Sequence, residues 1–321
     1  MEQKQQRKLI RSRMNPVGLT MLAYYGIMNV SVSFVMLLDM ALYFFTHLTS
    51  WSEAGLMERI QAFTTTNGWG YILAIVVGGV IVLLWKKPRF WKYVLSAKDK
   101  PMTFGAFMQL LCVFVSVQAV LQVFALAVEW LLNLLGLSIL TSMEAASISA
   151  DGFSMFLYIT ILGPVSEELL FRGLILRTLQ PYGKRFAIFA SAVAFGLLHG
   201  NLIQIPFAFF VGLVLGYVTL EYSIVWAIVL HIFNNLVLSD LLSRLSEILP
   251  EGVGDLIFLG ILVVAAIAAL VILLVCRKDV KAYFQANPKD KPTVRGFLSA
   301  PCVVIFGVLM ILSSFLLITK V

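Results

Sequence analysis

Charged side chains are scarce in this chain of 321 residues: Asp, Glu, Lys and Arg make up 13% of it, against about 25% in ordinary soluble domains. The chain has only three histidines. Its cysteines, Cys112, Cys276 and Cys302, are odd in number and show no metal-ligand spacing, which argues against a structural disulfide framework. The HExxH motif of many zinc proteases is missing as well. These absences exclude an ordinary soluble domain and a zinc-binding helix of the HExxH type.

Apolar residues make up 60% of the chain, and several apolar runs reach the roughly 20 residues that a helix needs to cross a bilayer. We therefore predict an all-α fold, a polytopic bundle of about eight or nine transmembrane helices. The first and third runs exceed one crossing, which predicts a tilt, a break or a partly interfacial course. The expected helices cover residues 17–48, 69–85, 103–135, 153–180, 185–201, 203–220, 224–240, 256–276 and 300–318.

Basic residues give the chain a net charge of +7, but their positions indicate topology rather than a nucleic-acid partner. Most of them gather before residue 14, between residues 86 and 100, and between residues 277 and 295. With the N-terminus inside and nine crossings, all three groups fall on one side of the membrane, as the positive-inside rule requires. The sequence therefore predicts an integral membrane protein with a cytoplasmic N-terminus.

One membrane-embedded unit accounts for the whole chain, with polar residues concentrated in its middle. We expect a basic anchor and scaffold helices in residues 1–152, a catalytic core in 153–240 and further transmembrane helices in 241–321. Within the core, Gly163-Pro164 is expected to break or kink its helix, because proline lacks a backbone donor. The pair Gly212 and Gly216 forms GxxxG, which predicts close helix packing within the bundle.

The segment EELLFR carries the first polar cluster, Glu167, Glu168 and Arg172. Glu168 and Arg172 are four residues apart and share a helix face, so they are expected to form an ion pair. Glu167 is rotated by about 100° from Glu168, which allows the two acids different tasks. A buried polar lock between helices is the plainer interpretation, but it leaves the second acid without a role.

Two of the three histidines lie in the other polar clusters, His199 at the end of FGLLH and His231 at the start of HIFNN. His231 and Asn235 share a helix face, whereas helix depth places His199 near an outer end. A histidine alone among apolar residues is as often structural as functional. Peptide hydrolysis needs a base for water, donors for an oxyanion and an acid for the departing amine. Glu167, the histidines and the Asn235 amide supply these roles together.

The ordered patterns EExxxR, FxxxH and HxxxN resemble the CPBP family of intramembrane proteases, also called type II CAAX endopeptidases or the Abi family. The resemblance covers residues 153–240. It implies that Glu167 and His199 activate water, that His231 and Asn235 form the oxyanion hole, and that Glu168 and Arg172 support the site without a cofactor. It also implies a membrane-anchored peptide or protein substrate within the lipid bilayer, and a bacterial plasma membrane as the location.

Three other functions compete with this one. In a metal-dependent protease, Glu167, His199 and His231 would bind a divalent ion such as zinc and leave one position to water. A proton-coupled transporter would use buried Glu and His as a relay, although the chain shows no inverted repeat. A non-catalytic membrane scaffold, or an immunity protein against bacteriocins, would keep the fold and the motifs without cutting anything.

Overall fold

The computed structural model describes residues 2–48, 52–146, 151–288 and 291–320. Nearly all of this described chain is helical. Its only β structure is a two-residue ladder, in which β1 (Leu137–Ser138) pairs antiparallel with β2 (Thr319–Lys320). The predicted all-α, polytopic helical bundle is therefore confirmed.

Each predicted apolar run is helical in the structure, with connecting helices between some of them. The N-terminal part contains α1 (Glu2–Thr46), α2 (Glu53–Thr66), α3 (Trp69–Trp85), α4 (Pro88–Ser96), α5 (Phe104–Asn133) and α6 (Leu140–Ala146). The middle contains α7 (Phe153–Leu157), η1 (Tyr158–Leu162), α8 (Gly163–Glu168), η2 (Leu169–Leu176), α9 (Arg177–Leu179), η3 (Gln180–Tyr182), α10 (Lys184–Leu198), α11 (Gln204–Glu221), α12 (Ile224–Ile232), η4 (Phe233–Leu241) and α13 (Leu242–Ile248). The C-terminal part contains α14 (Val253–Val275), α15 (Arg277–Ala286), α16 (Lys291–Leu298) and α17 (Pro301–Phe315).

Helix α1 begins at Glu2 rather than near residue 17, because the basic N-terminal segment continues the helix. Its Lys, Arg and Gln residues are good helix formers, and the helix passes Pro16 without ending. At 1.5 Å per residue its 45 residues extend for about 68 Å,. The helix is therefore much longer than the roughly 30 Å hydrocarbon core of a bilayer.

Five helical stretches of the described chain are long and apolar enough to cross a membrane, and the pair α2 and α3, bent by 51°, would make a sixth. The expected crossings at 185–201 and 300–318 are shorter, because α10 and α17 have 15 residues each. Length and composition alone thus support five or six spans, fewer than the eight or nine predicted. The polytopic character is confirmed at this coarser level.

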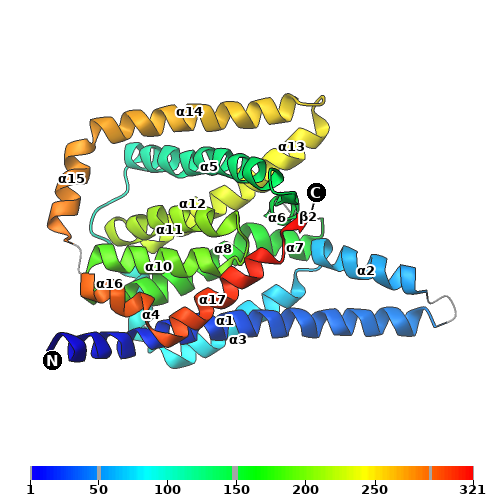
Figure 1. Cartoon of the computed structure of the whole chain (residues 1–321), viewed down its shortest axis with the longest axis horizontal. Coiled ribbons are helices and arrows are strands. Elements are labelled where there is room, and N and C mark those ends of the chain that lie inside the picture. The colour runs from blue at the N-terminus through cyan, green and yellow to red at the C-terminus, as the bar shows by residue number, and fades with distance from the viewer. Residues whose placement is uncertain (1, 49–51, 147–150, 289–290, 321) are drawn as a thin grey trace.

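The helices lie mainly along one direction, with α1, α3 and α17 on one side and α5 and α14 on the other (Figure 1). The central helices α10 and α11 carry the buried core, in which Phe195, Leu215 and Val218 are nearly or fully inaccessible. Peripheral helices instead expose large apolar side chains, such as Leu37 and Val275. An apolar outer surface of this extent is what a lipid-facing bundle requires.

The GxxxG pair lies on α11 where α10 approaches most closely. A Cβ added to Gly212 would lie 3.1 Å from the Cα of Ala192, and one added to Gly216 would lie 3.2 Å from the side chain of Ile188. Both glycines therefore permit the close packing that the motif predicted. The predicted unit boundary at 240/241 falls within the helical stretch Ile224–Ile248, so no linker separates the core from the C-terminal helices at that point.

Candidate active site

The helix that carries the two acids changes its hydrogen-bonding pattern at Gly163-Pro164 instead of ending there. The Gly163 amide donates to the carbonyl of Tyr158, five residues back, which is π-helix geometry. Pro164 has no amide proton. The carbonyl of Ile159 therefore accepts a hydrogen bond from neither Gly163 nor Pro164. The predicted break is thus replaced by π-helix on both sides of α8, in η1 and η2, and π-bulges often occur at functional sites.

Glu168 and Arg172 form the predicted ion pair. Arg172 Nη1 donates to Glu168 Oε1 over 2.8 Å, and both side chains are completely buried. The guanidinium also lies 4.3 Å above the centre of the Phe195 ring, and its Nη2 donates to the Gly212 carbonyl over 3.4 Å. Removing one partner of such a buried pair would leave the other uncompensated.

His231 contacts both acids from a different helix. Its Nδ1 lies 2.9 Å from the same Glu168 oxygen that binds Arg172, and its Nε2 lies 3.7 Å from Glu167 Oε2. With Nδ1 donating to Glu168, Nε2 is the nitrogen that faces Glu167. Glu167 keeps 17% of its side chain accessible, whereas Glu168 is fully buried. Of the two neighbouring acids, Glu167 is therefore the one that can meet water.

His199 is the residue that comes directly after α10, and it reaches the same cluster through Phe195. Its Nδ1 lies 2.9 Å from the Phe195 carbonyl, and the Phe195 ring meets the rings of His199 and His231 edge-on, with centroid distances of 5.0 and 5.7 Å. His199 and His231 thus pack against the same Phe195 ring, although α10 and α12 carry them separately.

Asn235 is held by a chain of side-chain amides that the sequence did not reveal. Gln118 on α5 donates to Asn234 Oδ1 over 2.6 Å, Asn234 donates to Asn235 Oδ1 over 2.9 Å, and Asn235 donates to the Ile159 carbonyl over 2.9 Å. This Ile159 carbonyl is the one that accepts a hydrogen bond from neither Gly163 nor Pro164 in the π-turn. An amide nitrogen carries two protons, so Asn235 retains one for another acceptor.

Two residues in this chain of amides were not predicted to matter. Asn234 was not among the predicted site residues, yet it is buried and donates to Asn235. Gln118 lies more than a hundred positions away from both in sequence. The signal that could have found it is a polar side chain in the middle of an apolar run.

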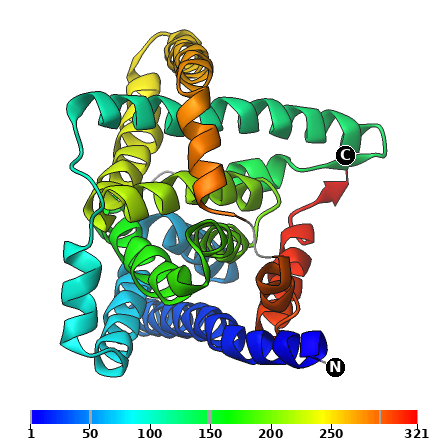
Figure 2. The same ribbon diagram turned by 90° about the vertical axis from the view of Figure 1, so that its left-hand side faces the viewer.

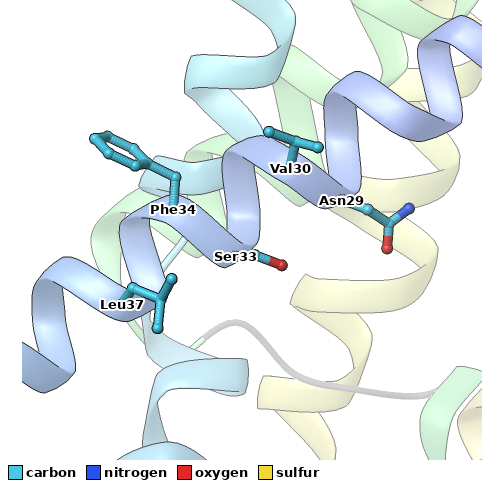
Figure 3. Close-up of a pocket in the computed structure, with 5 residues that line it drawn as sticks. All are labelled: Asn29, Val30, Ser33, Phe34 and Leu37. Atoms are coloured by element: carbon cyan, nitrogen blue, oxygen red, sulfur yellow. The ribbon is translucent and has the colours of Figure 1, made fainter.

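Two hollows of the molecule lie away from these six residues. A depression of about 380 Å³ runs along one face of α1 and is lined by Asn29, Val30, Ser33, Phe34 and Leu37 (Figure 3). A larger groove of about 1360 Å³ lies at the ends of α5, α10 and α11. Neither is lined by a predicted site residue.

The contacts of the imidazoles bear on the divalent metal considered as an alternative. Within the described parts of the chain, no three His, Cys, Asp or Glu side chains gather where they could hold a metal ion. His231 Nδ1 is occupied by Glu168, and His199 Nδ1 by a backbone carbonyl. Each imidazole therefore keeps Nε2 for another partner.

No curated protein and no solved structure matches this chain. Residues 149–237 match the family model described as type II CAAX prenyl endopeptidase Rce1-like. This segment contains all six predicted site residues and the π-helical turns that position them. The chain therefore carries an Rce1-like domain of the type II CAAX prenyl endopeptidases over residues 149–237, and the family resemblance of its motifs is confirmed.

Proposed function

We propose that the chain is an intramembrane endopeptidase in which Glu167 and His199 activate a water molecule against a peptide bond. The observation that carries this proposal is the difference in exposure and contacts between the two acids. Glu168 is buried and engaged by Arg172 and His231, whereas Glu167 is partly accessible and lies next to His231 Nε2. A site that needs a second, water-accessible carboxylate accounts for this arrangement.

In the first step, water adds to the carbonyl carbon of the peptide bond while Glu167 accepts its proton. His199 Nδ1 is held by the Phe195 carbonyl, so its Nε2 is free to bind the same water. The carbonyl oxygen becomes an oxyanion. The remaining amide proton of Asn235 and the imidazole of His231 stabilise that charge.

In the second step, the C–N bond breaks and Glu167 returns the proton to the departing amine. The products are a free carboxylate and a free amine, so protons balance over the cycle and Glu167 is regenerated. Glu168 and Arg172 do not take part in proton transfer. They hold His231 in place, which makes them positioning residues.

The proposed substrate is a peptide or protein that is anchored in the lipid bilayer. The Rce1-like match supports a membrane-anchored substrate at the level of the family. Nothing in the site requires a prenyl group, because the cluster consists of catalytic groups and Phe195. A bacterial plasma membrane with the N-terminus in the cytoplasm is the proposed location, and the clustering of basic residues supports this orientation.

The test compares peptide termini released from membranes that contain equal amounts of the wild type, Glu167→Gln or His199→Ala. We expect new termini with the wild type alone, because each variant removes a group that activates water. The control is His47→Ala, which changes the exposed third histidine beyond the end of α1 and should leave the termini unchanged.

The same experiment separates the proposal from its rivals. Identical termini for the wild type and both variants, with all proteins folded, would favour a non-catalytic scaffold or a bacteriocin-immunity protein. Loss of new termini in the His47→Ala control would point instead to a general effect of histidine substitution on folding.

A further inference from the structure

The groove of about 1360 Å³ lies at the end of the bundle where the basic segments gather, between α5, α10, α11, α14 and α15. Helix α15 turns away from the end of α14 and crosses this end of the bundle (Figure 2). Pockets for small ligands usually measure about 300–1,000 Å³. The groove exceeds that range and suits an elongated ligand with two chemically different ends.

The deeper part of the groove is apolar. It is lined by Val113 of α5, Phe189 of α10, Val214 of α11 and Leu273 of α14. Along α5 the lining extends from Ala106 to Val113, a rise of about 10 Å at 1.5 Å per residue. The groove therefore stays within one leaflet, whose hydrocarbon is roughly 15 Å deep. Leu273 is half exposed, so this wall also faces the surrounding lipid.

The outer rim of the groove carries three cations, Lys100, Arg185 and Arg295. Lys100 Nζ lies 4.7 Å above the ring of Tyr222 and 5.8 Å from that of Tyr217. Such stacking holds the ammonium at the rim. Arg295 is exposed.

The acids on the rim do not cancel this charge. Lys184 is shared by Asp99 at 2.6 Å and Glu221 at 3.1 Å, and Asp279 is the other acid that lines the groove. With Lys184 added to the three cations of the rim, four cations face these three acids, which leaves an excess of positive charge. The hydroxyl of Tyr283, which also lines the groove, is buried without a hydrogen-bond partner within the described chain. Buried polar groups are normally satisfied, and an oxygen atom of a bound ligand would satisfy this one after a small rotation of the ring.

We propose that this groove binds one anionic phospholipid from the leaflet on the basic side of the protein. Its phosphate lies among Lys100, Arg185 and Arg295, and an acyl chain lies along Val113, Phe189 and Val214. Basic pockets between transmembrane helices on the cytoplasmic side are suited to anionic headgroups. The bound lipid joins α15 to the ends of α5, α10 and α11. It does so away from Glu167 and His231, so this site does not depend on whether the chain cleaves peptides.

The test measures thermal unfolding of the full-length protein in neutral detergent, with phosphatidylglycerol or phosphatidylcholine of identical acyl chains added. A ligand that binds only the folded state raises its melting temperature. We expect phosphatidylglycerol to raise it by roughly 5 °C more than phosphatidylcholine does, since a lipid at about 100 times its Kd stabilises a protein of this size by several degrees. Native mass spectrometry should detect one retained phosphatidylglycerol.

The charge variant is Lys100→Gln with Arg295→Gln, and the matched control is Lys87→Gln, an exposed lysine outside the groove. Arg185 is left intact because it bonds the carbonyls of Phe284 and Asn287 and so secures α15. We expect the double variant to lose the difference between the two lipids and the control to keep it. Val214→Phe, which fills the apolar part without changing charge, should abolish retention of both lipids. Equal stabilisation of the wild type by the two lipids, or the same loss in Lys87→Gln, would overturn the proposal.

Discussion

Glu168 and His231 are 63 positions apart in the chain, yet a hydrogen bond of 2.9 Å joins the carboxylate of the first to Nδ1 of the second. The same carboxylate oxygen binds Arg172. One buried acid therefore connects the end of α8, the middle of η2 and the end of α12. This connection holds the imidazole beside Glu167. Substitutions that break it should therefore change both the stability of the fold and the rate of catalysis, each by a different amount.

Replacement of Arg172 by methionine should destabilise the protein strongly. The change leaves Glu168 buried without its cation, which costs about 3–5 kcal/mol in comparable cases. The measurement is the free energy of unfolding in mixed micelles. The double variant Glu168→Gln with Arg172→Met removes both charges and should recover part of the loss. A single variant as stable as the wild type would show that the pair is not what holds these helices.

The amide chain from Gln118 to Asn235 predicts two graded effects on turnover. Asn235→Ala removes a proposed oxyanion donor and should lower kcat by about 10²–10³-fold. Gln118→Leu removes only the hydrogen bond that orients Asn234, so we expect a loss of about 10-fold, with KM little changed. Both rates are measured on a fluorogenic peptide in proteoliposomes.

The control for Gln118 is Ser116→Ala on the same helix, whose hydroxyl bonds the Val113 carbonyl and touches no site residue. Its kcat should match that of the wild type. If Gln118→Leu also matched the wild type, the amide chain would be structural only.

Gly212 and Gly216 provide a matched pair on α11. A Cβ at Gly212 would lie 3.2 Å from Arg172 Nη2, whereas one at Gly216 would lie 3.2 Å from Ile188 Cγ2. Alanine at either position should crowd the helix contact and lower stability by about 1–3 kcal/mol. Only Gly212→Ala should also reduce turnover in the folded fraction, because it displaces the guanidinium that supports Glu168 and His231. Equal turnover in both variants would separate Arg172 from catalysis.

Strong chelation tests the metal-dependent alternative. We expect turnover to continue unchanged after prolonged dialysis against EDTA or 1,10-phenanthroline, because the proposed activation of water by Glu167 and His199 needs no metal ion. The rate before and after dialysis is the measurement. Loss of activity that returns on addition of zinc would overturn the proposed Glu167 chemistry.

Local spacing and composition predicted much of this protein correctly. The apolar runs predicted helices, because backbone groups in lipid must find partners within their own segment. The ion pair between Glu168 and Arg172 was predicted from a separation of one helical turn. The match over residues 149–237 confirmed the family that the three motifs resemble. Each of these features depends on neighbours in sequence or on the length of an apolar segment, which can be read without a fold.

Other features depended on how distant helices pack. The sequence placed His199 near an outer surface, and only the fold shows that it packs on the Phe195 ring, which also meets His231. Only the fold shows that Gln118 reaches Asn234, or that Asn235 meets the carbonyl left open before Pro164. Helical periodicity states which residues share a face, but not which neighbouring helix that face meets. Contacts between helices are set by close packing of the whole bundle, so the tertiary structure alone decided which polar groups became partners.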